Sequence, residues 1–314
     1  MRGYVANTDY DWFSFLSVHT PLDEVNFWQP SGGKKVFRVL GPGEPFFFRL
    51  KAPHNKIAGF GWFARHERLV RSSLAWDAFG IANGAETLEA MRRRIKKYAE
   101  KTPIQLGTDY PVGCLMISQP VFFPESKWID QPRDWAPNIV TGKGYDTGVG
   151  EGRRVFEECL AQLPAPEQPV AEALMSGDGS LSRYGQALLV QPRLGQGTFR
   201  IGLNSAYDGA CAVTNEHSWP VLEAAHIRPY SAGGEHRLCN GLLLRADIHK
   251  LFDKGYVTIT PDYLFKVSGR LEEEWNNGRA YYKRQGAPIR VPEQREDQPS
   301  KTILEWHNQE VFLG

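Results

Sequence analysis

The first third of the chain alternates short apolar, aromatic-rich runs with glycine and proline. Runs of this length, bounded by turn-forming residues, are typical of β-strands. They occupy residues 3–6, 35–40, 45–50, 57–63 and 112–123. The pattern therefore predicts a small barrel or a strongly curved sheet in this part of the protein.

A stretch with a helical period lies between the last two of these runs. Within residues 85–101, apolar side chains recur on one helical face at Leu88, Met91, Ile95 and Tyr98, which predicts a helix that packs on the sheet. Basic side chains fall largely on other faces, where they either contact phosphate or form a solvated surface. They are Arg92, Arg93, Arg94, Lys96 and Lys97.

The composition changes after residue 128. Residues 128–152 are rich in proline, glycine, aspartate and asparagine, which indicates a loop that leaves a domain. Residues 153–163 have the pattern of a short helix, and the prolines of residues 164–169 predict a stiff spacer. A further helical pattern extends over residues 170–189.

A chain of 314 residues is long enough for two domains, each with its own core. We place the boundary around residues 145–170 and expect an α+β protein. Its segments are an N-terminal domain over residues 1–145, a linker with a short helix over 146–180, and a C-terminal domain over 181–314.

Charge and hydropathy exclude several classes of protein. A net charge of +1 argues against a protein that coats nucleic acid indiscriminately, because such binding is mostly phosphate neutralisation. No stretch approaches the roughly 20 consecutive apolar residues that a membrane-spanning helix needs, so we expect no membrane partner. The N-terminus lacks the apolar core of a signal peptide, which predicts a cytoplasmic protein.

The cysteines are widely scattered along the sequence. Without close pairs, they indicate reduced thiols rather than a zinc ribbon or a disulfide framework. The alternative is a structural zinc site that joins Cys211 and Cys239 to His217 or His236.

Residues 222–255 concentrate the candidate chemistry. A strand over residues 221–227 contains His226, a polar loop follows, and Asn240 precedes a second strand over residues 241–245. Residues 246–254 then place their apolar side chains on one helical face and His249 with Asp253 on another. The sequence predicts the order strand, loop, strand, helix.

These residue types suit phosphodiester hydrolysis. The reaction needs a water that is deprotonated near neutral pH and a cation that takes up charge on the phosphate. Histidine suits the first task because its unperturbed pKa is about 6.5. His249 and Asp253 suit the second, since side chains four residues apart on a helix point to a common spot. A carboxylate near a helix C-terminus also favours a positive partner, either a metal or Lys250 or Lys254.

The segments 225–229, 240–242 and 249–255 resemble the motifs of the HNH endonucleases, whose fold unit is the ββα-metal finger. In that family the first histidine is the general base, the asparagine holds the loop and orients that histidine, and the last histidine binds a divalent metal. The resemblance implies these catalytic roles for His226, Asn240 and His249, with Mg²⁺ or Mn²⁺ as the cofactor.

This chain departs from the family at Ala225, where many members carry an Asp or His ligand. Asp253 or Glu223 completes the metal sphere, or His249 holds the ion mainly with phosphate and water. We favour His249 and Asp253 as ligands because of their helical spacing. Residues 207–214 with Trp306 and His307 also resemble one HNH branch that is common in bacterial restriction-type proteins, which extends the resemblance to residues 181–314.

A second resemblance covers roughly residues 1–140. Residues 26–33 mix aromatic, amide and hydroxyl side chains with glycines in a predicted loop, a combination that suits a pocket for a base flipped out of the duplex. With residues 23–33, 45–51 and 55–63, this part resembles the EVE branch of the PUA-like domains, which implies a β-barrel with helices. The implied base-pocket residues are Trp12, Trp28, Gln29 and Ser31.

An EVE-like domain joined to an HNH domain is an arrangement found among modification-dependent restriction endonucleases. The resemblance implies an enzyme that cuts double-stranded DNA carrying modified cytosine, 5-methyl or 5-hydroxymethyl. Two alternatives stay open: an HNH nuclease acting on RNA or unmodified DNA, and a binding protein whose nuclease finger has decayed, as Ala225 suggests. Cutting both strands needs two visits or two subunits, which makes a homodimer an expectation.

Overall fold

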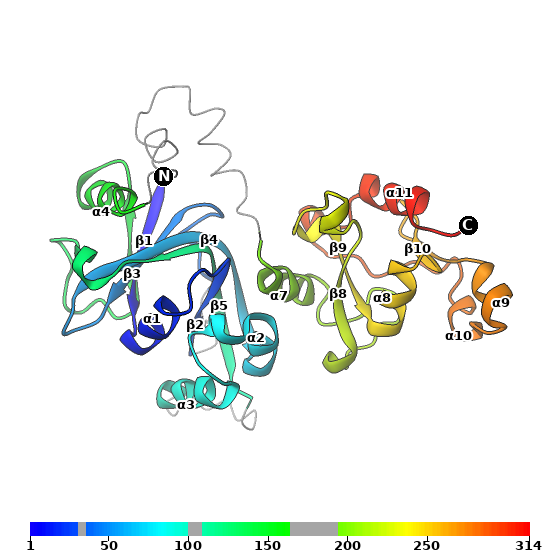
Figure 1. Ribbon diagram of the computed structural model, residues 1–314, viewed down its shortest axis with the longest axis horizontal. Helices are drawn as coiled ribbons and strands as arrows, with labels where there is room; N and C mark the ends of the chain where they lie inside the picture. The colour runs from blue at the N-terminus through cyan, green and yellow to red at the C-terminus, as the bar shows by residue number, and fades with distance from the viewer. Residues whose placement is uncertain (31–35, 100–108, 164–193) are drawn as a thin grey trace. The chain divides into compact units, whose positions relative to one another are not determined.

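The computed structural model describes residues 1–30, 36–99, 109–163 and 194–314 (Figure 1). The chain divides into two compact units, Met1–Thr198 and Phe199–Gly314, called here the N-terminal and C-terminal units. The predicted spacer over residues 164–169 and the predicted helix over 170–189 lie outside the described residues. Within the described ranges, every helix is too short or too polar to cross a membrane.

One mixed sheet forms the centre of the N-terminal unit. Its strands follow the order β2-β5-β4-β3-β1-β7, with the short β6 beside β4, and only the β1–β3 pair among these is parallel. The strands are β1 (Arg2–Thr8), β2 (Glu24–Gln29), β3 (Pro45–Leu50), β4 (Lys56–Arg71), β5 (Pro111–Phe122), β6 (Ile129–Asp130) and β7 (Gly142–Asp146). The pairings among the described residues form an open path, so they confirm the α+β class but do not close a barrel.

Helices cover both faces of this sheet. They are α1 (Tyr10–Ser17), α2 (Ser72–Phe79), α3 (Leu88–Ala99) and α4 (Gly150–Leu160), with short 3-10 turns η1 (Gly80–Asn83) and η2 (Glu125–Lys127). Strand side chains alternate between faces, so Phe47 contacts Phe156 of α4 whereas Phe48 contacts Trp12 of α1. This two-sided cover explains why all of β3 is buried.

Several sequence predictions for this unit are confirmed. Strands occupy the predicted positions at residues 3–6, 45–50, 57–63 and 112–123, but β4 continues to Arg71, well beyond the predicted end at residue 63. Helix α3 lies within the predicted 85–101, and α4 largely coincides with the predicted 153–163. In α3, Met91 and Ile95 are buried as expected, whereas Tyr98 is 44% exposed.

Three predictions for this unit are wrong. The described residues of the predicted strand 35–40 form no strand. Residues 26–29, predicted as part of a loop, belong to β2, where the amide of the buried Asn26 donates to Asn83 Oδ1 and Cys114 Sγ. Residues 142–146, also predicted as loop, form β7 at the sheet edge against β1. In both cases a partner distant in sequence supplies the backbone pairing that local polarity argued against.

The C-terminal unit is built around a hairpin and a helix. Strand β8 (Leu222–His226) pairs antiparallel with β9 (Gly241–Arg245), and α8 (Ala246–Asp253) follows directly (Figure 1). Ile248 and Phe252 are the buried side chains of α8, and Gly255 ends this segment with a φ of +76°. The predicted order of strand, loop, strand and helix is confirmed.

The remaining elements surround this hairpin. They are β10 (Val257–Ile259), β11 (Phe265–Val267), α9 (Arg270–Trp275), α10 (Arg279–Tyr282), α11 (Lys301–Glu310) and the 3-10 turns η5 (Trp219–Val221), η6 (Tyr230–Ala232), η7 (Leu238–Asn240) and η8 (Arg295–Asp297). Helix α7 (Gln196–Ala206) spans the division between the two units. From α11, His307 stacks on Phe252 with ring centroids 3.7 Å apart.

Candidate active site

His226 lies at the last position of β8, opposite Gly241 of β9. Its ring stacks on Phe199, with centroids 4.1 Å apart and planes inclined by 10°. A side chain at position 241 would meet the Phe199 ring at 2.7 Å, so only glycine allows this approach. Nε2 of His226 lies 2.9 Å from Nδ1 of His236.

The surroundings of His226 favour its neutral form. Burial lowers the pKa of His226 to about 4, and the nearby His236 and His249 add to the effect. At neutral pH the ring is therefore uncharged, and one of its nitrogens is able to accept a proton.

Asn240 closes the loop between the two strands. Its side chain is 1% exposed; Oδ1 accepts from the backbone N–H of Arg228, and Nδ2 donates to the carbonyls of Arg228 and Glu235, each at 2.9 Å. A buried amide with three satisfied hydrogen bonds holds both sides of the loop at a fixed separation. This is the geometry that a loop-holding residue requires.

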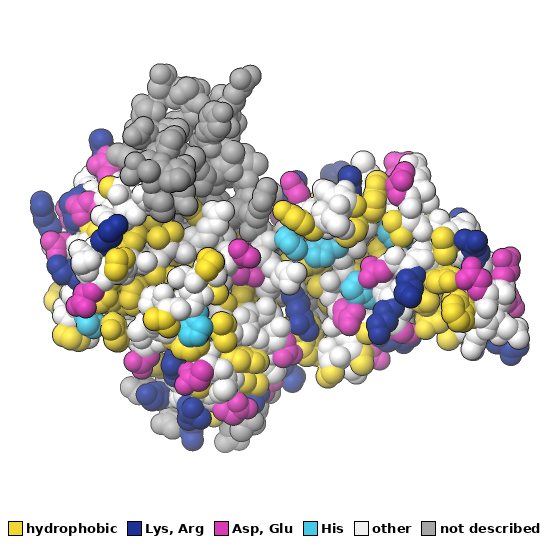
Figure 2. Space-filling model, viewed as in Figure 1, with side chains coloured by type: hydrophobic (Ala, Val, Ile, Leu, Met, Phe, Trp, Pro, Cys, Tyr) yellow, Lys and Arg dark blue, Asp and Glu magenta, His cyan; other side chains and the backbone are white. Residues whose placement is uncertain are grey.

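His249 lies between two carboxylates. Its Nδ1 is 2.7 Å from Oε2 of Glu223, and its Nε2 is 3.4 Å from Oδ2 of Asp253. Burial and the charge of Glu223 raise the pKa of Asp253, whereas His249 lowers it. Figure 2 shows histidine and acidic side chains on one face of this unit. The structure thus brings together both carboxylates considered as ligands.

His249 and the two carboxylates beside it supply nitrogen and oxygen donors of the types that divalent metals bind. If Glu223 accepts the Nδ1 hydrogen of His249, Nε2 keeps its lone pair and faces Asp253, an arrangement typical of a metal-binding histidine held by a carboxylate. Within the described ranges, His, Cys, Asp and Glu side chains form no group of three or more arranged to hold a metal. Phosphate and water would therefore supply the remaining ligands, as is usual for Mg²⁺.

The position before His226 belongs to the core. Ala225 is fully buried and pairs with Leu242. Glu223, two residues earlier on the same face of the strand, is the carboxylate of β8 that reaches His249.

The sequence suggested only a zinc-binding role for His236 and did not predict its contact with His226. It lies in the polar loop, four residues before Asn240, and its ring is nearly parallel to that of Tyr230. Cys211, the other residue considered for a zinc site, has its Sγ atom occupied as an acceptor from the backbone N–H groups of Thr214 and Arg245. Loop conformation brings the two histidines together, and residue spacing alone does not reveal it.

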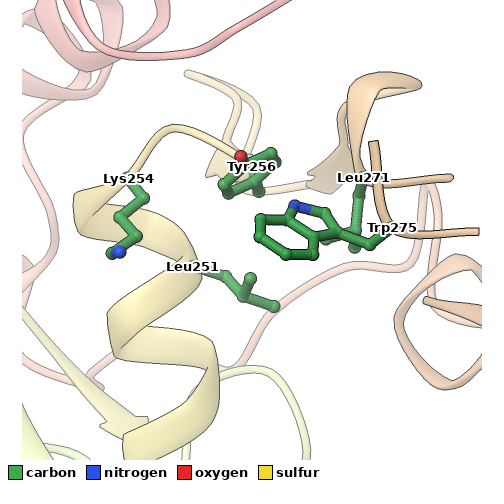
Figure 3. Close-up of a pocket in the computed structure, with 5 residues that line it drawn as sticks. All are labelled: Leu251, Lys254, Tyr256, Leu271 and Trp275. Carbon is green, nitrogen blue, oxygen red and sulfur yellow. The ribbon is translucent and has the colours of Figure 1, made fainter. Parts of the chain in front are cut away.

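A cavity of about 490 Å³ opens beside α8 (Figure 3). It is lined by Leu251, Lys254, Tyr256, Leu271 and Trp275. The Tyr256 hydroxyl donates to Glu274 at 2.6 Å, which puts a carboxylate close to the largely apolar lining. None of the candidate metal ligands Glu223, His249 and Asp253 is among the residues that line it.

The predicted base-pocket residues have different environments in the N-terminal unit. Trp12 is 5% exposed and packs edge-on against Phe27 and Phe48, and its N–H has no hydrogen-bond partner among the described residues. The Trp28 N–H donates to the carbonyl of Asn83, and Gln29 ends β2. Ser31 lies outside the described residues.

Comparison with known proteins finds a family match within this unit. Residues 211–260 match the HNH endonuclease family, so this part of the chain is an HNH endonuclease domain. Among solved structures, the modification-dependent TagI restriction endonuclease is similar over 35% of this chain and 36% of its own, with 20% identity and a TM-score of 0.27. The chain thus matches little more than a third of that protein. No curated protein matches the chain.

Proposed function

We propose that the protein is a modification-dependent endonuclease that recognises modified cytosine, 5-methyl or 5-hydroxymethyl, in double-stranded DNA and hydrolyses phosphodiester bonds with a divalent metal. The observation that carries the nuclease part is the arrangement within the HNH domain. There a neutral His226 ends the first strand of a hairpin that Asn240 holds closed, and His249, flanked by carboxylates, lies on the helix that follows the hairpin. These groups correspond to the two requirements of the chemistry, a base and a cation site.

Each of these residues has a definite task in the reaction. His226 accepts a proton from a water molecule, and the resulting hydroxide attacks phosphorus. The bond from phosphorus to the leaving oxygen breaks, and that oxygen departs with the bonding electron pair and takes up a proton from solvent water. Asn240 holds the loop that follows His226 through its hydrogen bonds to the backbone of Arg228 and Glu235. His249 and Asp253 would hold the metal, Mg²⁺ or Mn²⁺, which when bound neutralises charge on the phosphate.

We assign recognition of the DNA target to the N-terminal unit. We infer an EVE-like, PUA-type domain over residues 1–145 that receives a flipped base, with Trp28, Gln29 and Ser31 around the base. The half-buried Trp28 at the end of β2 supports this placement because its ring is held by one hydrogen bond to Asn83. Trp12, packed in the aromatic core, would support the pocket from beneath.

Plasmid cleavage tests the proposal. Modified and unmodified plasmids of identical sequence are incubated with the protein and Mg²⁺ or Mn²⁺, with a chelator in the control. Faster cutting of the modified plasmid is expected, and cutting should cease with the chelator. Equal cutting of both plasmids would remove the modification requirement, and cutting that persists in the chelator would remove the metal.

Two further parts of the proposal concern the protein in the cell. A homodimer would place one HNH domain on each strand, and sedimentation of the protein with and without a modified duplex measures its mass directly. A monomer in both conditions would contradict the dimer. A cytoplasmic location follows from the proposed role on DNA, and cell fractionation tests it.

A further inference from the structure

The two imidazoles of His226 and His236 form one hydrogen bond. Nδ1 of His236 lies 2.9 Å from Nε2 of His226, and burial lowers the pKa of both rings. Two neutral imidazoles at this separation share a single proton, so one ring donates and the other accepts. The direction of this bond decides which nitrogen of His226 is free.

Aromatic neighbours lie against both rings. Phe199 stacks on His226, and the ring of Tyr230 lies nearly parallel to that of His236, with planes inclined by 13°. The backbone beside His236 is fixed as well, because the carbonyl of Glu235 accepts from the buried Asn240. The contact between His226 and His236 is therefore part of the packed structure of the loop.

The reaction selects one direction for the bond. If His236 donated to Nε2, the neutral His226 would carry its own proton on Nδ1 and would have no free lone pair. If His226 donates through Nε2, its Nδ1 is bare, and among the described residues that atom makes no hydrogen bond. A bare nitrogen is what a general base requires.

We propose that His236 is a positioning residue: it accepts the Nε2 hydrogen of His226 and so keeps Nδ1 of His226 free to take the proton from water. The proposal rests on the proposed function, because the direction of the bond follows from His226 acting as the base. A histidine pair of this kind would orient the base as a carboxylate or a backbone carbonyl does elsewhere.

The test combines His236→Leu, which removes the acceptor, with His236→Asn, whose Oδ1 can occupy the place of Nδ1. His217→Leu, at an exposed histidine of the same unit, is the matched control. Full-length protein with ¹⁵N-labelled histidine reports the tautomer of His226 by NMR, and His226→Gln identifies its signals. Single-turnover cleavage and DNA affinity are measured on the same samples.

In the wild type and in His236→Asn, His226 is expected to carry its proton on Nε2. In His236→Leu the tautomers should mix, and the cleavage rate should fall by roughly 10- to 100-fold, the usual effect of losing a group that orients a histidine, with DNA affinity unchanged. His236→Asn should recover most of this rate, and His217→Leu should match the wild type.

Two results would overturn the positioning role. One is an unchanged His226 tautomer in His236→Leu, and the other is a His236→Asn variant as slow as His236→Leu despite the same unfolding midpoint. Failure of the proposed function looks different. His226→Gln would then cut as fast as the wild type, or no variant would cut, while the NMR signals still decide whether the pair exists.

Discussion

The two units arrange their candidate functional side chains in different ways. In the C-terminal unit, polar atoms hold one another at hydrogen-bond distance, as in His226 with His236 and His249 with Glu223. In the N-terminal unit, Trp12 is held by edge-on contacts with other aromatic rings. A polar site leaves an ordered motif in the sequence because each residue type is required, whereas an aromatic residue serves a pocket or a core equally well.

The proposed function assigns cutting to the C-terminal unit and recognition of the target to the N-terminal unit. The largest expected effect is that of His226→Ala, which should slow cleavage by roughly 10²- to 10⁴-fold, the usual contribution of a general base. Binding to modified and unmodified duplexes should stay as in the wild type. Single-turnover cleavage and fluorescence anisotropy measure the two properties separately.

A change of binding preference in His226→Ala would break this assignment, because the nuclease site would then take part in recognition. Cleavage at the wild-type rate would instead remove His226 as the base. The exposed His217→Ala is the control for losing a histidine in the same unit.

Low pH should strongly reduce the stability of the C-terminal unit, because His307 is buried there in its neutral form. Burial lowers the pKa of His307 to about 4, while its Nδ1 accepts from Thr258 and its Nε2 donates to the Phe252 carbonyl. Between this pKa and the unfolded value near 6.5, the unfolded chain binds more protons, so stability falls as the pH is lowered. The loss should reach about 3 kcal/mol by pH 4 from this group alone.

Urea unfolding followed unit by unit by hydrogen exchange, from pH 7 to pH 4, measures this loss. The C-terminal unit also contains His226 and His236, whose pKa values are lowered, whereas His66 is the corresponding group found among the described residues of the N-terminal unit. His307→Gln should reduce the pH dependence of the C-terminal unit. An equal dependence in wild type and variant would contradict the assignment to His307.

Asp253→Asn tests which carboxylate beside His249 is the metal ligand. If Asp253 is a metal ligand, the variant should bind Mn²⁺ at least roughly tenfold more weakly, as measured by titration calorimetry without DNA. Glu223→Gln is the matched comparison, because it removes the other carboxylate that contacts His249. A larger loss in Glu223→Gln would make Glu223 the ligand and Asp253 the supporting residue.

Trp28→Ala carries the smallest expected effect and tests the other unit. Losing one stacking ring should reduce the preference for modified over unmodified duplex by roughly tenfold, within the usual range of about 1 to 3 kcal/mol per stacked base. Cleavage at saturating protein should change little. Trp275→Ala, at an exposed indole of the C-terminal unit, is the control. An unchanged preference in Trp28→Ala would remove this residue from the pocket.

The nuclease hairpin was predictable because its signals are local. Alternation within residues 221–227 predicted the first strand, and the second was placed at residues 241–245, directly after Asn240. The spacing of Ile248 and Phe252 predicted the helix with nearly its observed bounds. The contact of His249 with Asp253 follows from the same helical geometry. The pairing of His226 with His236 does not, because it depends on the path of a loop closed by Asn240.

The sheet of the N-terminal unit was predicted only in part. Its most apolar strands were recognised, but β2 and β7 carry polar side chains and acquire their strand structure from partners far along the chain. Asn26 illustrates the difficulty: a polar residue predicted to lie in a loop is buried in β2, where its Nδ2 donates to Oδ1 of Asn83. Long-range pairing of this kind overrides local preference.

The segment that matches the HNH family ends at residue 260, but the contacts that hold its helix in place extend further. His307 packs on Phe252, and the backbone N–H of Leu313 donates to the carbonyl of Gly255 at 3.0 Å. A version of this unit joined to a different domain would therefore have to carry residues up to about 313. The unit that can be transplanted is longer than the motif by which it is recognised.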